Sequence, residues 1–167
     1  MLKASKKKTK IRAAGARFAI VAAQYNPVYT DSLVRAIRRE LHEAGCKAIE
    51  LYRVPGSFEI TTAAAALAAR KQNPFAAIIC VGVIMRGATT HADVIAHAAA
   101  YGITAIQVAE KVPVINGVYL FENEEQARQR CLDPKFNRGL ELARTALQMA
   151  EVMEQIRQQR PSAFSKA

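Results

Sequence analysis

Short apolar runs alternate along the chain with segments whose apolar residues recur every three or four positions. The runs have the length and composition of β-strands, and the spaced segments have the period of amphipathic α-helices. Candidate strands cover 17–23, 47–53, 76–81, 104–108 and 114–120. The first candidate helix begins at Thr30 or Asp31 and ends near Gly45. The other candidate helices begin at or just after the first residue of these ranges and end near the last: 57–71, 91–101, 124–130 and 137–159.

This alternation predicts the fold class. Strands that alternate with helices at short spacing form β-α-β units, whose strands pair in parallel and whose helices cover both faces of the sheet. The run 76–81 is apolar throughout, as expected for a strand buried on both faces. We therefore predict an α/β fold, a three-layer αβα sandwich with a central, mainly parallel four-stranded sheet.

Length and charge divide the chain into one folded domain and two short ends. A chain of 167 residues with 51% hydrophobic residues can bury the core of one domain. Positions 1–12 hold six basic residues and no acidic residue, which is more than half of the net charge of +10. We predict a basic, flexible arm over 1–16, a domain over 17–160 and a tail over 161–167. A solvated arm is the favoured interpretation, and contact of the arm with RNA or an anionic surface is the alternative.

Cysteine spacing and hydropathy predict a cytoplasmic protein. Cys46, Cys80 and Cys131 are odd in number and widely spaced, so they do not form a disulfide framework. No apolar run approaches the roughly 18 residues of a membrane-spanning helix, and no apolar stretch follows the basic amino terminus as in a secretory signal. We expect a reduced, cytoplasmic protein with no membrane partner and no nucleic-acid partner.

Ligands of parallel sheets bind at the carboxyl ends of the strands, which selects the loops 24–30, 54–59, 82–91 and 116–123. The loop 82–91 leaves the most buried predicted strand and enters a helix. Its amides at Ala88, Thr89 and Thr90 would lie at the start of that helix, beside the flexible Gly87, where unpaired N–H groups can bind phosphate. A glycine-containing helix cap explains the same pattern.

His91 is the only one of three histidines that falls in a strand-end loop. An imidazole there can transfer protons near neutral pH, although a purely structural role is the alternative. His97 follows six residues later and would lie on another helix face, so no metal site is predicted. Asp93 does not face His91 on a helix and is expected to interact with the helix dipole. Cys80 lies in a buried strand, a poor place for a reactive thiolate.

Three further groups near strand ends can bind a substrate, and each has a structural alternative. Tyr25 and Asn26 offer a ring for stacking and an amide for hydrogen bonding, or packing at a rim. The segment 57–59, Ser-Phe-Glu, opens a helix, where it can bind a ligand or cap the helix. Arg130 and Arg138 flank a break between two helices, either as anion clamps or as solvated side chains.

In their order along the chain, these motifs resemble one known family. The matching segments are Tyr25-Asn26, VPGSFEI (54–60), IMRGATTH (84–91), PVINGV (113–118), ENEEQARQR (122–130) and NRG (137–139). Together they are similar to 6,7-dimethyl-8-ribityllumazine synthases, over about residues 17–157. The second and third segments are the most specific of the set.

The resemblance implies an activity. The family condenses 5-amino-6-(D-ribitylamino)uracil with 3,4-dihydroxy-2-butanone 4-phosphate, which is the penultimate step of riboflavin biosynthesis. An amine forms an imine with the ketone, phosphate leaves, and the ring closes with loss of water. This chemistry requires no metal and no organic cofactor. It does require an anion site, a group that transfers protons and a slot for a flat ring that carries a polyol.

The resemblance also assigns roles to residues of this chain. His91 matches the proton-transfer histidine, and the phosphate site matches Ala88, Thr89 and Arg130. The positions that match the uracil and ribityl sites are Tyr25, Asn26, Ser57, Phe58, Glu59, Val83, Ile84, Met85, Asn116 and Arg138.

Several positions depart from the family pattern. Asn116 stands where the family usually has a phenylalanine that packs over the heterocycle from a neighbouring subunit, and the loss of that ring is expected to weaken ring binding by ~1 kcal/mol. Arg138 replaces a lysine and keeps its charge but not its shape. Further departures occur at Tyr119, Leu120, Phe121 and Pro134. They motivate an alternative, a lumazine- or flavin-binding protein of the same fold with weak or no catalysis.

The resemblance implies an assembly as well. Family members form homopentamers with active sites between adjacent subunits, and some pentamers close into icosahedral shells. The segment 131–137 has no insertion relative to the shell-forming pattern, which favours a shell. Riboflavin synthase is a further candidate partner.

Overall fold

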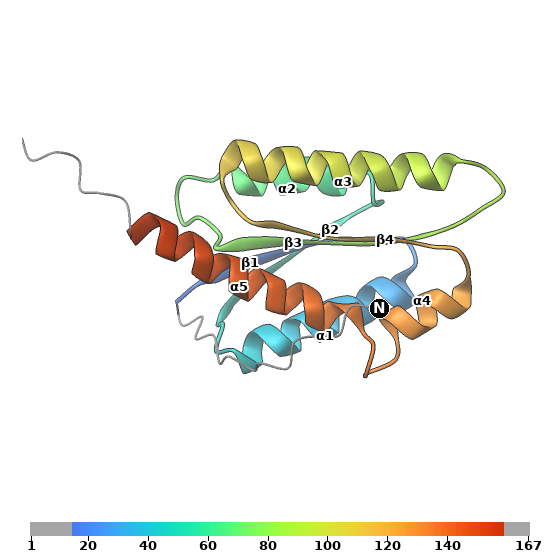
Figure 1. Ribbon diagram of the computed structural model, residues 1–167, viewed down its shortest axis with the longest axis horizontal. Helices are drawn as coiled ribbons and strands as arrows, with labels where there is room; N and C mark the ends of the chain where they lie inside the picture. Colours follow the sequence, from blue (N-terminus) through green and yellow to red (C-terminus); the bar gives the residue numbers. More distant parts are fainter. Residues whose placement is uncertain (1–14, 159–167) are drawn as a thin grey trace, which may run out of the picture.

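The computed structural model describes residues 15–158 and shows a four-stranded parallel sheet between two layers of helices (Figure 1). The strands are β1 (Arg17–Ala23), β2 (Ala48–Val54), β3 (Ala77–Met85) and β4 (Val114–Phe121), in the spatial order β2-β1-β3-β4. The helices α2 (Ile60–Ala68) and α3 (His91–Glu110) cover one face. The other face is covered by α1 (Pro27–Glu43), α4 (Glu124–Cys131) and α5 (Arg138–Gln158). The predicted three-layer sandwich is confirmed.

The sheet separates two apolar cores. Successive side chains of a strand point to opposite faces, so Phe18 and Ile20 of β1 pack with α1 and α5, whereas Ala19 and Val21 pack with α2 and α3. All but the last residue of β3 are buried, as predicted from its apolar sequence. Positions 1–14 of the predicted arm and the predicted tail 161–167 lie outside the described residues.

The predicted strand over 104–108 is wrong, because α3 continues without interruption to Glu110. Isoleucine, threonine and valine in this stretch favour a strand locally. The helix nevertheless places Ala99, Ile103 and Ile106 on one face at helical spacing. Ala99 is buried, and Ile103 and Ile106 pack into the core beside β4. Lys111 ends the helix in the left-handed conformation, with φ of 56°.

Three predicted boundaries also need correction. β3 runs through Met85 because residues 82–85 pair with 118–121 of β4, so the loop before α3 covers only 86–90. α1 begins at Pro27 rather than near Thr30, because proline fits the first helical turn and Asn26 takes the left-handed conformation before it. α2 begins at Ile60, after a turn that contains Ser57.

The expectation that no segment is long and apolar enough to span a membrane needs correction for α3. Within residues 15–158, this helix alone meets that length and composition test, with a mean hydropathy of 1.2, and 17% of the tested window is buried. One such helix is weak support for a membrane span. Val94, Tyr101 and Val108 leave much of its outer surface apolar and exposed.

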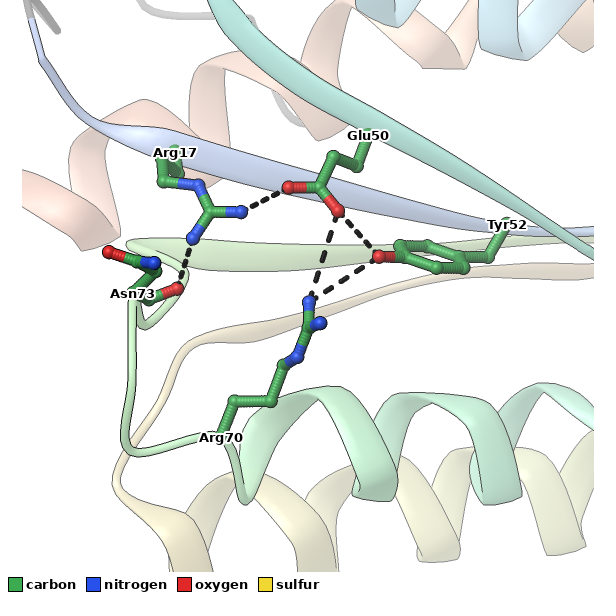
Figure 2. A network of polar contacts seen from close by, with 5 residues as sticks. All are labelled: Arg17, Glu50, Tyr52, Arg70 and Asn73. Atoms are coloured by element: carbon green, nitrogen blue, oxygen red, sulfur yellow. Dashed lines mark hydrogen bonds and ion pairs between the residues drawn. The ribbon is translucent and has the colours of Figure 1, made fainter.

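A polar network fixes the end of the sheet where β1 and β2 begin (Figure 2). The Glu50 carboxylate accepts a hydrogen bond from the Tyr52 hydroxyl at 2.5 Å, pairs with Arg17 and lies 3.9 Å from an Arg70 nitrogen. The Tyr52 and Arg17 hydrogen bonds lower the pKa of Glu50. The guanidinium of Arg17 stacks on Phe75, 4.9 Å from the ring centroid. This end of the sheet is therefore tied together by its own side chains.

Candidate active site

The carboxyl ends of β1, β2 and β3 open into one cavity of about 610 Å³. Three of the four loops selected from the sequence contribute to it, and the β3 residues form part of its wall. The lining residues are Tyr25, Asn26, Gly56, Ser57, Phe58, Glu59, Val83, Ile84, Met85, His91, Val94 and Ile95.

Two aromatic side chains lie at the cavity with most of their surface exposed. Tyr25 is 71% exposed and Phe58 is 56% exposed. Aromatic rings that serve packing alone are usually covered by other protein side chains. The exposed rings of Tyr25 and Phe58 are therefore free to stack on a ligand. The apolar side chains of Val83 and Ile84, both buried, line the same cavity from β3. The cavity thus combines an apolar wall with exposed rings.

Polar groups in the first two loops are partly used by the protein itself. The side-chain amide nitrogen of Asn26 donates to the carbonyl oxygen of Val83 at 2.8 Å, which leaves the amide oxygen as the group that can face a ligand. The Glu59 carboxylate accepts a hydrogen bond from the Gly56 amide at 2.8 Å and closes the turn before α2. Ser57 is buried against Gly82, where an added Cβ would lie 2.5 Å from its hydroxyl oxygen.

His91 is the first residue of α3 and is exposed at the cavity. Its ring is therefore accessible for proton transfer and is not packed into the interior. Its main-chain amide donates to the Thr89 hydroxyl at 3.4 Å. Val94 and Ile95 also line the cavity and were missed from the sequence, although their positions three and four residues after His91 place them on the same side of a helix.

The remaining predicted site residues do not line the cavity of this chain. Ala88 and Thr89 are exposed in the loop beside His91. Arg130 lies on α4 and is half-buried.

Two of these residues engage neighbours in the chain instead. The guanidinium of Arg138 pairs with Glu141 one turn later on α5. The amide oxygen of Asn116 accepts a hydrogen bond from the Val118 amide of its own strand at 3.0 Å. Within one chain, predicted residues of the first three loops therefore meet at the cavity, whereas the predicted cationic residues Arg130 and Arg138 lie outside it.

An ion cluster next to the cavity was not predicted. Arg86 pairs with Asp93 at 2.5 Å and with Glu122 at 2.7 Å. The hydrogen bonds from Arg86, and then the charge of its guanidinium, lower the pKa of Asp93. Asp93 was expected only to interact with the dipole of α3, and the pairing was missed because Glu122 and Asp93 meet Arg86 only in the folded chain.

Potential metal ligands are not clustered within residues 15–158, and the three cysteines there are buried. Among residues 15–158, no three His, Cys, Asp or Glu side chains are grouped so that they could hold a metal ion. Burial raises the pKa of the Cys80 thiol to about 12, so it is protonated at neutral pH. Among the residues that line the cavity, His91 and Glu59 offer an imidazole and a carboxylate for acid-base chemistry.

The comparison with known families decides the assignment. A family model described as 6,7-dimethyl-8-ribityllumazine synthase matches residues 15–154. The chain belongs to the 6,7-dimethyl-8-ribityllumazine synthase family. The resemblance inferred from the loop motifs is thereby confirmed, and the chain is classed with transferase enzymes of riboflavin biosynthesis.

Individual relatives agree with this assignment. The chain is 40% identical over 146 residues to the chloroplastic 6,7-dimethyl-8-ribityllumazine synthase of Arabidopsis thaliana, which is 86% of this chain and 63% of that protein. It is 39% identical over 143 residues to the 6,7-dimethyl-8-ribityllumazine synthase of Stenotrophomonas maltophilia (strain R551-3), covering 84% and 91% of the two chains. The protein of the same name from Xylella fastidiosa (strain 9a5c) is 38% identical over 148 residues, covering 87% and 95%.

Proposed function

We propose that the cavity condenses 5-amino-6-(D-ribitylamino)uracil with 3,4-dihydroxy-2-butanone 4-phosphate to give 6,7-dimethyl-8-ribityllumazine, phosphate and water. The observation that carries this proposal is the convergence of exposed rings, an apolar wall and an accessible histidine at the carboxyl ends of three parallel strands. The site thus offers stacking for a flat ring, polar groups for a polyol and an imidazole for proton transfer.

The pyrimidine lies against Tyr25 and Phe58 in this proposal, with Val83 and Ile84 beneath it. Both rings are exposed in the single chain, so stacking on a substrate breaks few contacts within the protein. The ribityl hydroxyls bond to the amide oxygen of Asn26 and to polar groups of the segment 57–59. Asn26 is well suited to this role, since its hydrogen bond to Val83 fixes the orientation of the amide.

His91 moves protons while the amine forms an imine with the ketone, phosphate departs and the ring closes. The phosphate binds beside the loop 87–90 at the start of α3, where main-chain amides and the dipole of a 20-residue helix favour an anion. Ala88 and Thr89 supply amides there. Leaving-group binding and proton transfer would thus occur within one short segment.

A second copy of the chain completes the site in this proposal. Arg130, Asn116 and Arg138 do not line the cavity of their own chain, whereas a neighbouring subunit can present them to it. We propose a homopentamer of this kind, with closure into an icosahedral shell as a further step. The exposed apolar surface of α3, which includes Val94 and Tyr101, is the kind of surface that such an assembly covers.

The remaining parts of the proposal concern the surroundings of the enzyme. We propose that residues 17–160 form the catalytic domain, between a basic arm at 1–16 and a tail at 161–167. We also propose a cytoplasmic location and riboflavin synthase as the partner that consumes the product.

An assay with both substrates tests the proposed reaction. Purified protein is expected to form a fluorescent lumazine together with inorganic phosphate in equal amounts. Tight binding of the lumazine without turnover would instead support the alternative of a binding protein, which the loss of an aromatic residue at Asn116 favours. Absence of both turnover and binding would reject the proposal.

A further inference from the structure

One side chain ties together both ends of the loop 87–90. Arg86 directly follows β3, and its main-chain amide donates to the carbonyl oxygen of Phe121 at 2.9 Å. Its two terminal nitrogens donate to the two carboxylate oxygens of Asp93 at 2.5 and 2.8 Å, and its Nε donates to Glu122 at 2.7 Å. Arg86 therefore links the ends of β3 and β4 to the first turn of α3.

The geometry makes this link stronger than an ordinary surface ion pair. A guanidinium that binds both oxygens of one carboxylate fixes distance and orientation together. The Arg86 and Asp93 side chains are 31% and 32% exposed, so solvent screens the pair less than it screens a fully exposed one. Lysine could not reproduce this arrangement, because its ammonium group binds as a single point.

The loop between Arg86 and α3 has little other support. Residues 87–90 are all exposed, and an added Cβ at Gly87 would meet nothing within 4 Å. Within residues 15–158, the only other side-chain hydrogen bond in this loop joins the Thr89 hydroxyl to the His91 amide at 3.4 Å. The side-chain contacts that hold the two ends of the loop are therefore mainly those of Arg86.

We propose that Arg86 is a positioning residue, which holds the loop 87–90 and His91 in the geometry needed to bind and release the phosphate of the substrate. This inference rests on the proposed function of the cavity. Arg86 acts without touching the substrate, because two carboxylates already occupy its guanidinium, and the three side chains together carry one net negative charge. A phosphate would have to displace Asp93 or Glu122 to reach it.

Substitutions of the pair test this role by their effect on each substrate separately. Arg86→Gln and Asp93→Asn are each expected to raise KM for the phosphate-bearing substrate about tenfold or more, because a misplaced binding group loses affinity steeply. KM for the pyrimidine is expected to change less than about twofold. Arg86→Lys should restore only part of the loss.

The control is Arg144→Gln, which removes an ion pair of similar length, 2.6 Å, between α5 and Glu40 of α1. This variant should leave both KM values unchanged. The double variant of Arg86 and Asp93 should be no worse than the more affected single variant, because both substitutions break the same contact. Equal increases in the two KM values, or additive effects in the double variant, would overturn the proposal.

Hydrogen exchange provides a readout that does not need turnover. The amides of Asp93 and Val94 both donate to the carbonyl oxygen of Thr90, so they report on the first turn of α3. Their exchange should accelerate about tenfold in Arg86→Gln and stay unchanged in Arg144→Gln. A wild-type protein without turnover would reject the proposed function, whereas unchanged exchange in Arg86→Gln would reject the positioning role.

Discussion

His91 is the residue on which the proposed chemistry depends most directly. It lies exposed at the cavity and begins α3, directly after the loop 87–90 that is proposed to bind phosphate. His91→Ala is expected to lower kcat about a hundredfold, which is typical for removal of a group that transfers protons. KM for the phosphate-bearing substrate should stay within about twofold, because main-chain amides bind the phosphate.

Steady-state kinetics and thermal unfolding measured on the same samples check this prediction. The side chain is exposed, so the free energy of unfolding should change by less than about 0.5 kcal/mol. A variant with wild-type kcat would exclude His91 as the proton-transfer residue.

The sequence located single residues well where they follow strands. Tyr25, Asn26, Phe58 and His91 come together because the carboxyl ends of parallel strands meet at one edge of a sheet. Val94 and Ile95 were missed because they lie inside α3, beyond the loop. The partners of Arg86 could not be read from spacing, since Glu122 follows a different strand.

At the scale of elements, the close approach of α5 to the sheet depends on Gly117 of β4. A Cβ there would lie 2.6 Å from the carbonyl oxygen of Cys80 and 2.5 Å from a methyl carbon of Leu142. A main-chain oxygen in the middle of the sheet cannot move away easily, so Gly117→Ala is expected to lower the free energy of unfolding by about 2 kcal/mol.

Urea unfolding measures this effect, and Gly87→Ala is the matched control because its Cβ would meet nothing within 4 Å. The control should lose much less stability. Equal stability of the two variants would mean that the contact at Gly117 does not limit the packing of α5 on β4.

The link between β3 and α3 should also depend on pH. Arg86 lowers the pKa of Asp93 in the folded chain, so the pairing stabilises the fold at pH values above the ordinary carboxyl pKa of about 3.9. This contribution is lost as the pH falls through the lower folded value. Asp93→Asn should therefore be less stable than wild type at pH 7, and the difference should shrink below about pH 4.

Unfolding by urea at a series of pH values tests this expectation. Arg144→Gln serves as the comparison, because it leaves Asp93 and Arg86 in place. A stability difference between wild type and Asp93→Asn that stays constant down to about pH 2 would contradict the assigned pairing.

Elements were predicted well where the apolar pattern was unambiguous and poorly where it was not. β1 and the fully apolar β3 were identified because their sequences suit buried strands, and α5 begins directly after Asn137, as expected. The stretch 104–108 was misassigned because its β-branched residues suit a strand locally, whereas in the helix only Ile106 of them packs into the core and Val108 is exposed. Only packing against the sheet resolves that choice.

For the molecule as a whole, the sequence pattern predicted the layered architecture, and the family resemblance implied a site completed by a neighbouring subunit. The order of strands and helices determines the sandwich, and the four-stranded sheet is present as expected. Arg130 and Asn116 do not line the cavity of their own chain, and spacing within one chain does not encode the contacts between chains through which a neighbour is proposed to present them. In the proposed assembly, one subunit supplies His91 and another supplies Arg130.

Subunit complementation tests this claim most directly. His91→Ala and Arg130→Ala are coexpressed with different affinity tags, and oligomers that carry both tags are purified. Each variant alone should be nearly inactive, whereas random mixing around a ring should restore about a quarter of wild-type sites, since a cavity with His91 then meets a neighbour with Arg130. Mixed oligomers that are no more active than the separate variants would contradict a site shared between subunits.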